Sequence, residues 1–393
     1  MDLKEAIRQA MLAARSVEGR TSPRPPVGAV LVRHGQIVGR GATAPPYGPH
    51  AEVQALTEAG PAARDADLYV TLEPCCTTMH TPPCTEAIIA AGVRRVFVGT
   101  LDPHPAVCTY GIQQLQRAGL DVVLLEHEHE ALALIRPFET FITQGRSYVT
   151  AKWAMTLDGK LATRTKSSGW VSGTESRLWA HDLRDRVDAI LVGAQTARID
   201  NPQLTVRLGS AQRRFERTTR TRPPRRVVLA THGQLPDGLA LLQPGSEAET
   251  WIVVGETCAV AQRTHLESFG VHVLPVSFDE RGRVSLPATL QALAQRGIVH
   301  VLLEGGATLL GSAFDQHCID HAVAFIAPIL IGGGEAPSPI GGEGLAELIH
   351  ACRLQHRQTH FLGEDVLVEG DVVYAPPPSP GTREEQTLYA QPL

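Results

Sequence analysis

The chain has 393 residues, of which 43% are hydrophobic, 20% charged and 5% aromatic, with 36 glycines and 28 prolines. This composition excludes a single small module, a fibre and a disordered chain, and at about 150 residues per domain it predicts two or three globular domains. Lys and Arg total 36 against 41 Asp and Glu. The net charge of −5 therefore lacks the basic footprint of a protein that binds a nucleic-acid backbone.

No part of the sequence has the pattern of a membrane span or a secretory signal. The longest strongly apolar stretch, 322–331, is far short of the roughly 20 residues that a spanning helix needs. Residues 1–5 lack the shape of a signal peptide. Seven cysteines, three of them within 75–84, favour a metal site over a disulfide framework. We therefore expect a cytoplasmic protein.

Helical and strand patterns alternate over the first part of the chain. The predicted elements are a helix over 3–14, a hairpin over 27–32 and 37–39, a helix over 50–56, a strand over 66–72, a helix over 85–91, a strand over 93–98, a helix over 113–118, a strand over 121–125 and a connecting helix over 126–142. This alternation predicts a layered α/β domain. We place its boundary at Gln144-Gly145, so that the first domain spans 1–145.

The same alternation continues in a second α/β domain, which we place at 146–375. Its predicted elements are strands over 148–151, 189–192, 226–229, 250–254 and 299–303 and a helix over 175–184. The basic, proline-bearing segment 213–226 is typical of a solvated loop, and we assign it no role. The proline-rich tail 376–393 is predicted to be disordered.

The most specific chemical pattern in the sequence is His50-Ala51-Glu52 followed by Cys75 and Cys84. One imidazole and two thiolates suit Zn²⁺, and three protein ligands leave a fourth tetrahedral position for water, as in a catalytic site. Glu52 lies two residues from His50 at the start of a predicted helix, so it would reach that water rather than the metal. We expect Glu52 to carry a proton from the water to a leaving amine.

Other interpretations of the cysteines stay open at this point. A structural zinc site would have four protein ligands, and Cys76 offers a thiol that competes with Cys75 for the metal. We expect Cys75, which directly follows Pro74, to be the ligand. The remaining cysteines lack ligand-like spacing and are expected to be ordinary buried residues: Cys108, Cys258, Cys318 and Cys352.

The pattern of His50, Glu52, Cys75 and Cys84 resembles the zinc deaminase superfamily, which includes cytidine, deoxycytidylate and tRNA adenosine deaminases. Four segments narrow the resemblance to the deaminase half of the bifunctional riboflavin-biosynthesis deaminase-reductases: 49–53, 71–75, 81–84 and 102–103. The resemblance implies a three-layer α/β domain like that of cytidine deaminase. It also implies that Glu52 is catalytic and that His50, Cys75 and Cys84 hold the zinc ion.

The second half of the chain is similar to the reductase half of the same family. The matching segments follow one another in the family's order: 154–160, 168–173, 190–194, 200–207 and 303–307. The resemblance covers about residues 1–375 and implies a fold like that of dihydrofolate reductase, with NADPH as the cofactor. Gly305 and Gly306, which follow a predicted strand, also suit the approach of a phosphate to a helix N-terminus.

The family's motifs place cofactor and substrate contacts at particular residues of this sequence. The resemblance implies that NADPH contacts Ala154, Trp170, Thr196, Asp200, Thr231, Gly306, Ala307, Thr308, Leu309 and Leu310. It implies that the substrate contacts Ser168, Arg184, Leu204, Arg207 and Glu304. The guanidinium groups of Arg184 and Arg207 suit a substrate phosphate, which each can bind through two hydrogen bonds.

Several deaminase positions outside the metal set depart from the family's pattern. The family has Asn where this chain has Arg24, and its residues also differ at Thr77, Met79, His80 and His104. An amide offers a pyrimidine both a donor and an acceptor, whereas a guanidinium offers donors only. The departures therefore predict a changed reading of the base in this pocket.

The leading hypothesis is a two-step enzyme of riboflavin biosynthesis. The first domain would deaminate a phosphoribosylated diaminopyrimidinone with zinc, and the second would reduce the ribosyl group of the product to ribityl with NADPH. The alternatives are a reductase with a silenced or redirected deaminase acting on a related pyrimidine, an RNA-editing deaminase and a non-catalytic zinc scaffold. We expect a small-molecule substrate, no nucleic-acid or membrane partner, and a homo-oligomer.

Overall fold

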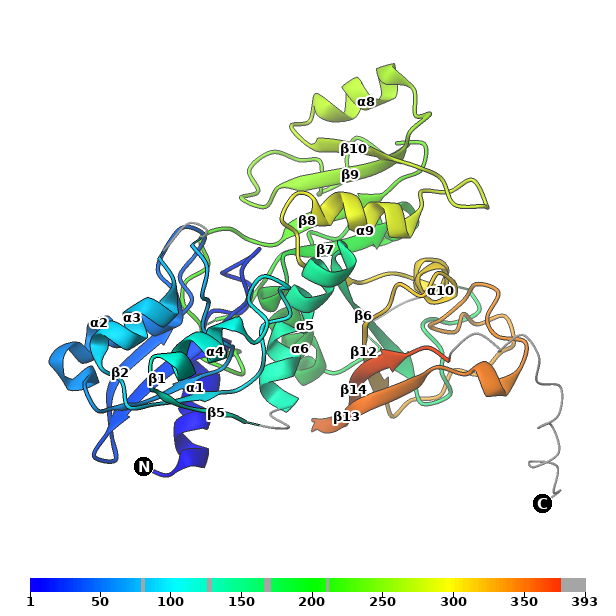
Figure 1. Ribbon diagram of the computed structural model, residues 1–393. Helices are drawn as coiled ribbons and strands as arrows, with labels where there is room; N and C mark the ends of the chain where they lie inside the picture. The colour runs from blue at the N-terminus through cyan, green and yellow to red at the C-terminus, as the bar shows by residue number, and fades with distance from the viewer. Residues whose placement is uncertain (79–81, 126–128, 166–170, 210–211, 376–393) are drawn as a thin grey trace, which may run out of the picture.

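The computed structural model describes residues 1–78, 82–125, 129–165, 171–209 and 212–375. The described residues form two β-sheets (Figure 1). A five-stranded sheet with the order β2-β1-β3-β4-β5 belongs to the N-terminal part, and a nine-stranded sheet with the order β10-β9-β8-β7-β11-β6-β12-β14-β13 belongs to the C-terminal part. Among these residues no helix is long and apolar enough to cross a membrane.

The N-terminal part alternates strands and helices, as predicted. Its elements are α1 (Leu3–Arg15), β1 (Gly28–Arg33), β2 (Gln36–Ala42), α2 (Ala51–Ala59), the 3₁₀ helix η1 (Gly60–Ala63), β3 (Asp67–Val70), α3 (Cys84–Ala91), β4 (Arg95–Val98), α4 (Tyr110–Arg117), β5 (Asp121–Leu124) and α5 (His129–Gln144). The side chain of Asp2 caps the start of α1 by accepting a hydrogen bond from the N–H of Glu5.

Small residues bring the first two helices close to the five-stranded sheet. A Cβ on Gly28 of β1 would lie 2.0 Å from the carbonyl oxygen of Ala10 in α1, and a Cβ on Gly41 of β2 would lie 2.0 Å from that of Ala51 in α2. Helix α1 packs on one face of the sheet, and α2 and α3 pack on the other. The N-terminal part is therefore the three-layer domain that the resemblance implied.

The C-terminal part contains the larger sheet and its covering helices. Its elements are β6 (Tyr148–Thr156), α6 (Thr174–Arg186), β7 (Ala189–Gly193), α7 (Ala194–Asp200), β8 (Arg225–Leu229), β9 (Thr250–Gly255), α8 (Val260–Glu267), β10 (His272–Val276), α9 (Leu286–Ala294), β11 (His300–Leu303), α10 (Ala307–Asp315), β12 (His321–Ala327), η3 (Leu348–His350), β13 (Arg353–Leu362) and β14 (Asp365–Val373).

The larger sheet is parallel from β10 to β12 and ends in the antiparallel strands β14 and β13. Helices α6 and α8 contribute to the apolar core on one face of this sheet, and α9 and α10 contribute to the core on the other. The carboxyl ends of the parallel strands share one edge, where open α/β sheets bind their ligands. We therefore expect the ligand site at that edge.

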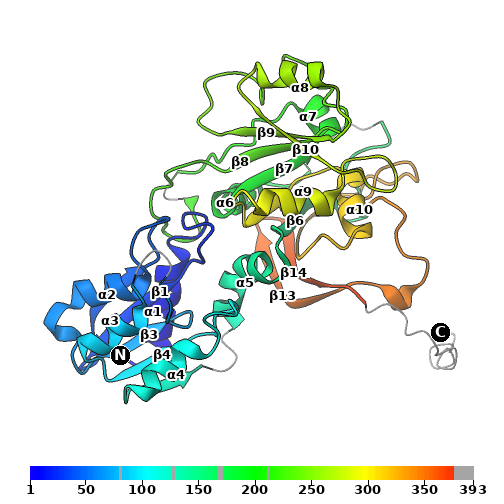
Figure 2. The ribbon, with the colours of Figure 1, turned by 45° about the horizontal axis from the view of Figure 1, so that its top comes forward.

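Helix α5 lies between the two sheets in both views of the molecule (Figures 1 and 2). At its start Glu130 accepts a hydrogen bond of 2.8 Å from Arg15 of α1. In its middle Arg136 contacts His356 of β13, with 3.1 Å between Nη2 and Nδ1. The helix that connects the two parts of the chain therefore contacts both of them.

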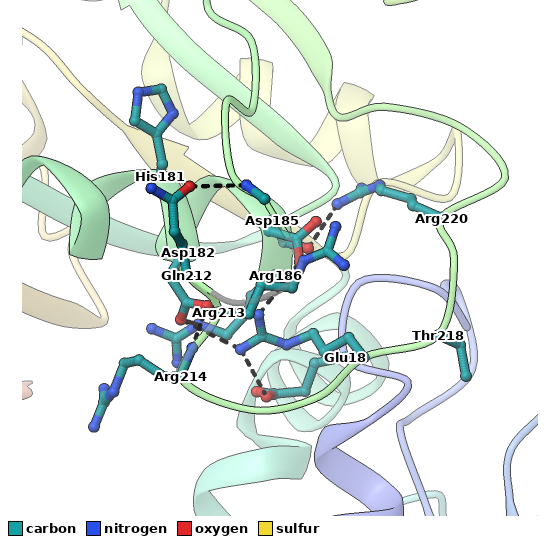
Figure 3. Close-up of polar contacts among 12 residues, drawn as sticks. Glu18, His181, Asp182, Asp185, Arg186, Gln212, Arg213, Arg214, Thr218 and Arg220 are labelled. Carbon is teal, nitrogen blue, oxygen red and sulfur yellow. Dashed lines mark hydrogen bonds and ion pairs between the residues drawn. The ribbon is translucent and has the colours of Figure 1, made fainter.

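The segment 213–226 lies at the junction between the two domains, so the expectation of a solvated loop holds for only part of it. Arg217 is only 6% exposed, and its guanidinium donates a hydrogen bond of 2.7 Å to Asp182 of α6. On the same helix Asp185 accepts a bond of 2.9 Å from Arg20 of the N-terminal domain. Figure 3 shows Asp182 and Asp185 among the polar residues of this junction. A buried arginine needs such partners because removing one of them costs about 3–5 kcal/mol. Because the arginines and their aspartate partners are far apart in the sequence, no local pattern predicts that these side chains are buried together.

Candidate active sites

The structure brings His50, Cys75 and Cys84 together. Their ligand atoms all lie within 4.8 Å of one another. The Nδ1 atom of His50 is 3.5 Å from the sulfur of Cys75 and 3.3 Å from that of Cys84. The competing thiol of Cys76 lies outside this cluster and contacts the carbonyl oxygen of Ala106 instead. In the described ranges no other group of His, Cys, Asp or Glu side chains is gathered in this way.

Two helix N-termini meet at the cluster. His50 is the N-cap residue of α2, and Cys84 is the first residue of α3. The backbone N–H of Cys84 donates to the sulfur of Cys75, which follows β3, over 3.4 Å. Glu52 lies in the first turn of α2 and is 4% exposed. Because the N-terminus of a helix carries partial positive charge, both helices favour thiolates at this point.

The thiol and carboxyl groups of the cluster have shifted pKa values. A hydrogen bond with Cys84 lowers the pKa of Cys75 to about 4, although burial opposes the shift. The same bond raises the pKa of Cys84. Burial, together with the charge of Cys75, raises the pKa of Glu52 to about 7. The site therefore favours a thiolate at Cys75, helped by its contact with His50. This donor set of one imidazole and two thiols fits zinc.

A cavity of about 340 Å³ opens onto the cluster, and His50, Glu52 and Cys75 line it. Of the pocket positions that depart from the family's pattern, three line the same cavity: Arg24, Thr77 and His104. The other two, Met79 and His80, lie outside the described residues.

Sequence reasoning missed two parts of this cavity wall. Phe138, Phe141 and Ile142 of α5 line it, although the sequence indicated only a connecting helix there. Asp102 lines it too. Burial raises the pKa of this carboxyl to about 6, although a hydrogen bond from the backbone N–H of His104 acts to lower it. A carboxyl group and an apolar wall therefore share the pocket with the metal cluster.

A second cavity, of about 630 Å³, lies at the carboxyl ends of the parallel strands in the larger sheet. Most of the residues expected to contact NADPH line it: Ala154, Thr196, Asp200, Thr231, Gly306, Ala307, Thr308 and Leu309. Three of the residues expected to contact the substrate line it as well: Arg184, Leu204 and Glu304. The residues expected to contact the cofactor and those expected to contact the substrate therefore share one cavity.

Four of the expected reductase residues are not placed in this cavity. Leu310 is fully buried in the core beneath α10. Arg207 is exposed, and its backbone N–H donates to the Nδ1 atom of His181 over 3.2 Å. Ser168 and Trp170 lie outside the described residues.

A buried ion pair and a neighbouring lysine line this cavity. Arg184 donates two hydrogen bonds of 2.7 Å to the carboxylate of Glu304. Burial would raise the pKa of Glu304, but the charge of Arg184 holds it at about 2. Lys152 of β6 also lines the cavity, and burial lowers its pKa while the charge of Glu304 opposes this. Sequence reasoning missed Lys152, whose only signal is a lysine within a buried strand.

The start of α10 suits a phosphate of a nucleotide cofactor. Gly306 is the N-cap residue of this helix, and a Cβ placed on it would meet nothing nearer than the hydroxyl of Thr196 at 3.9 Å. A Cβ on Gly305 would lie 2.9 Å from the side chain of Leu309, so this glycine permits the close packing of the turn. The free N–H groups of a helix N-terminus bind phosphate, and the cavity therefore fits NADPH.

The two sites define a zinc-dependent deaminase joined to a reductase that uses a nucleotide cofactor. Comparison with known families agrees: residues 147–368 match the RibD C-terminal domain, and residues 1–100 match the cytidine and deoxycytidylate deaminase zinc-binding region. The chain belongs to the RibD family of riboflavin biosynthesis proteins. It is thus a bifunctional zinc deaminase and NADPH-dependent reductase of riboflavin biosynthesis.

Relatives and solved structures match almost the whole chain. The riboflavin biosynthesis protein RibD of Bacillus amyloliquefaciens is 40% identical over 92% of this chain and 96% of its own, and that of Aquifex aeolicus is 39% identical over 93% and 97%. A structure of Acinetobacter baumannii RibD is 30% identical over 94% of this chain and 98% of its own, with a TM-score of 0.79. A deaminase/reductase structure from Thermotoga maritima has the same identity, coverage and TM-score. Both domains of this chain are therefore represented in its relatives.

Proposed function

We propose that this chain catalyses two consecutive reactions on one small molecule. The first is the hydrolytic deamination of the phosphoribosylated diaminopyrimidinone, and the second is the NADPH-dependent reduction of the product's ribosyl group to ribityl. The observation that carries the proposal is the cluster of His50, Cys75 and Cys84 with the buried carboxyl of Glu52 in one cavity. The Thermotoga maritima relative is described as a deaminase and reductase of these pyrimidines, which supports the same substrate here.

In the deaminase site His50, Cys75 and Cys84 would hold the zinc ion. Zinc bound at such a site activates water for attack on the pyrimidine ring. Glu52 takes a proton from the attacking water and returns it to the leaving amine, so that ammonia departs. Burial keeps Glu52 away from bulk water and raises its pKa, which suits a group that must both accept and release a proton.

In the reductase site the cofactor contacts belong to two groups of residues. The first group lines the cavity: Ala154, Thr196, Asp200, Thr231 and the segment 306–309. The second group is carried over from the family's motifs alone: Leu310 and Trp170. The substrate contacts are Arg184, Leu204 and Glu304 in the cavity, together with Arg207 and Ser168 from the motifs. These residues bring the nicotinamide and the sugar together for hydride transfer.

Three further assignments complete the proposal. The deaminase domain spans 1–145 and the reductase domain spans 146–375, whereas 376–393, predicted from the sequence to be a disordered tail, lie outside the described residues. The protein acts in the cytoplasm, which is consistent with free thiols at all seven cysteines. It forms a homo-oligomer.

The alternative of a reductase with a silenced or redirected deaminase is not favoured. A silenced site has no need to keep the metal ligands and a buried carboxyl together, yet His50, Glu52 and Cys75 line one cavity and Cys84 joins the metal cluster. Membership of the RibD family likewise disfavours an RNA-editing enzyme and a non-catalytic scaffold.

Removing zinc is expected to separate the two activities. Protein dialysed against a zinc chelator should lose deamination almost completely, while NADPH oxidation on the pre-deaminated substrate should continue at the rate of untreated protein. Ammonia release and NADPH absorbance measure the two activities, and adding zinc back should restore the first. Deamination at an undiminished rate in protein shown to be zinc-free would rule out the proposed deaminase site.

A further inference from the structure

Arg24 lines the deaminase cavity, and its guanidinium faces a loop of the protein. Its Nη1 atom donates to the carbonyl oxygen of Gly48 over 2.9 Å. Its Nη2 atom donates to the carbonyl oxygens of Ala44 over 3.2 Å and of Pro45 over 2.5 Å. These donors are therefore engaged by the backbone, so Arg24 holds the loop in addition to lining the pocket.

The loop that Arg24 binds leads directly to the metal cluster. It is closed by a hydrogen bond of 3.1 Å from the N–H of Ala44 to the carbonyl oxygen of Pro49, and His50 is the next residue. Tyr47 in the loop lines the deaminase cavity, as do Arg24 and His50. Any displacement of this loop would thus move both a wall of the substrate pocket and the residue before a metal ligand.

The segment just before Arg24 is anchored on the other domain. Arg20 donates to both carboxylate oxygens of Asp185 at the end of α6, over 3.1 and 2.9 Å. The side chains of this pair are 3% and 2% exposed. Ser22 donates to the carboxylate of Asp188, just before β7, over 2.9 Å. Two residues of the N-terminal domain are therefore fixed by the reductase domain.

A tight turn joins this anchor to Arg24. The N–H of Arg24 donates to the carbonyl oxygen of Thr21 over 3.0 Å, and the hydroxyl of Thr21 donates to the carbonyl oxygen of Arg24 over 2.8 Å. The turn therefore fixes Arg24 relative to Thr21, the residue after Arg20. Hydrogen bonds and this short stretch of backbone together connect α6 to the loop before His50.

We propose that Arg24 is a positioning residue of the deaminase, which ties the loop 44–48 of the substrate pocket to a turn that the reductase domain holds in place. The inference rests on the proposed deaminase function. It means that the deaminase pocket takes its binding geometry only while the reductase domain is docked against Arg20 and Ser22.

The first test compares Arg24→Met with the wild-type chain in steady-state deamination and in hydrogen-deuterium exchange of the amides of Ala44, Tyr47 and Gly48. The other residues of 44–49 are prolines and have no exchangeable N–H. We expect the KM for the pyrimidine to rise about tenfold, equivalent to about 1.4 kcal/mol, with kcat within about threefold, zinc content unchanged and faster exchange in the loop. Arg24→Lys, which keeps a charged donor, should recover part of both effects. Arg40→Met, which removes an exposed arginine of β2, is the matched control and should change neither.

The second test concerns the anchor. Arg20→Met should speed exchange in 44–49 although Arg20 does not touch that loop. Ser22→Ala should have the same effect to a smaller extent, and it serves as the test if Arg20→Met folds poorly. Wild-type KM and wild-type loop exchange in Arg24→Met would overturn the positioning role. Unchanged loop exchange in both anchor variants would overturn the link to the reductase domain. If the wild-type chain released no ammonia, the proposed deaminase function would fail. The exchange comparison would still show whether Arg24 and its anchor hold the loop in place.

Discussion

Replacing Glu52 by Gln is expected to reduce the rate of deamination about 10³-fold, within the range that general acid-base catalysis contributes. Gln has the same size as Glu and keeps the packing at this 4% exposed position, but it neither accepts nor returns a proton. Ammonia release from the diaminopyrimidinone substrate measures the effect, and metal analysis should show zinc content equal to that of the wild-type chain.

The same Glu52→Gln protein provides its own control in the reductase reaction. NADPH oxidation on the pre-deaminated substrate should proceed at the wild-type rate, because the second cavity lies in a different domain. Glu58→Gln, a change at the exposed end of α2, should leave deamination unchanged. Full deamination by a zinc-loaded Glu52→Gln protein would show that another group moves the proton.

Replacing Glu304 by Gln should impair the reductase reaction and spare deamination. We expect kcat/KM of the reductase to fall by about 10²-fold or more. The carboxylate binds Arg184 through two bonds of 2.7 Å in a buried place. Loss of one partner of a buried ion pair costs about 3–5 kcal/mol, because the other charge stays unpaired. Arg184 and the neighbouring Lys152 would then be free to shift away from the substrate. NADPH absorbance with the pre-deaminated substrate measures the loss.

For Glu304→Gln the deaminase reaction is the internal control and should stay at the wild-type rate. Glu267→Gln, at the exposed end of α8, is the matched variant and should leave both reactions unchanged. A Glu304→Gln protein with full reductase activity would contradict the place that we assign to this carboxylate in the substrate site.

The deaminase elements were predictable because their patterns are local. The helix predicted over 85–91 is Cys84–Ala91, and it ends at Gly92, whose φ of 69° lies in the left-handed region. The metal cluster was predictable for another reason. The identities and spacing of His50, Cys75 and Cys84 carry the chemistry even though their proximity depends on the whole fold.

Other features depend on tertiary contacts that no local pattern reveals. Strand β6, predicted to end at residue 151, continues to Thr156 because β12 pairs with it from Thr150 to Thr156. Strand β13 was missed because it is the exposed edge of the sheet and lacks the apolar alternation of a half-buried strand. The partners of Arg24 and Arg217 were missed because they are backbone carbonyls and distant carboxylates, which leave no signal around either arginine.

The central claim is that one chain carries out both reactions in order on the same molecule. Mass spectrometry of purified, zinc-loaded protein supplied with the phosphoribosylated diaminopyrimidinone tests it most directly. We expect replacement of one amine by oxygen without NADPH, and the further gain of two hydrogens when NADPH is present. Unchanged substrate under both conditions, with NADPH oxidised only when the pre-deaminated compound is supplied, would contradict the account and show that the first domain does not deaminate this molecule.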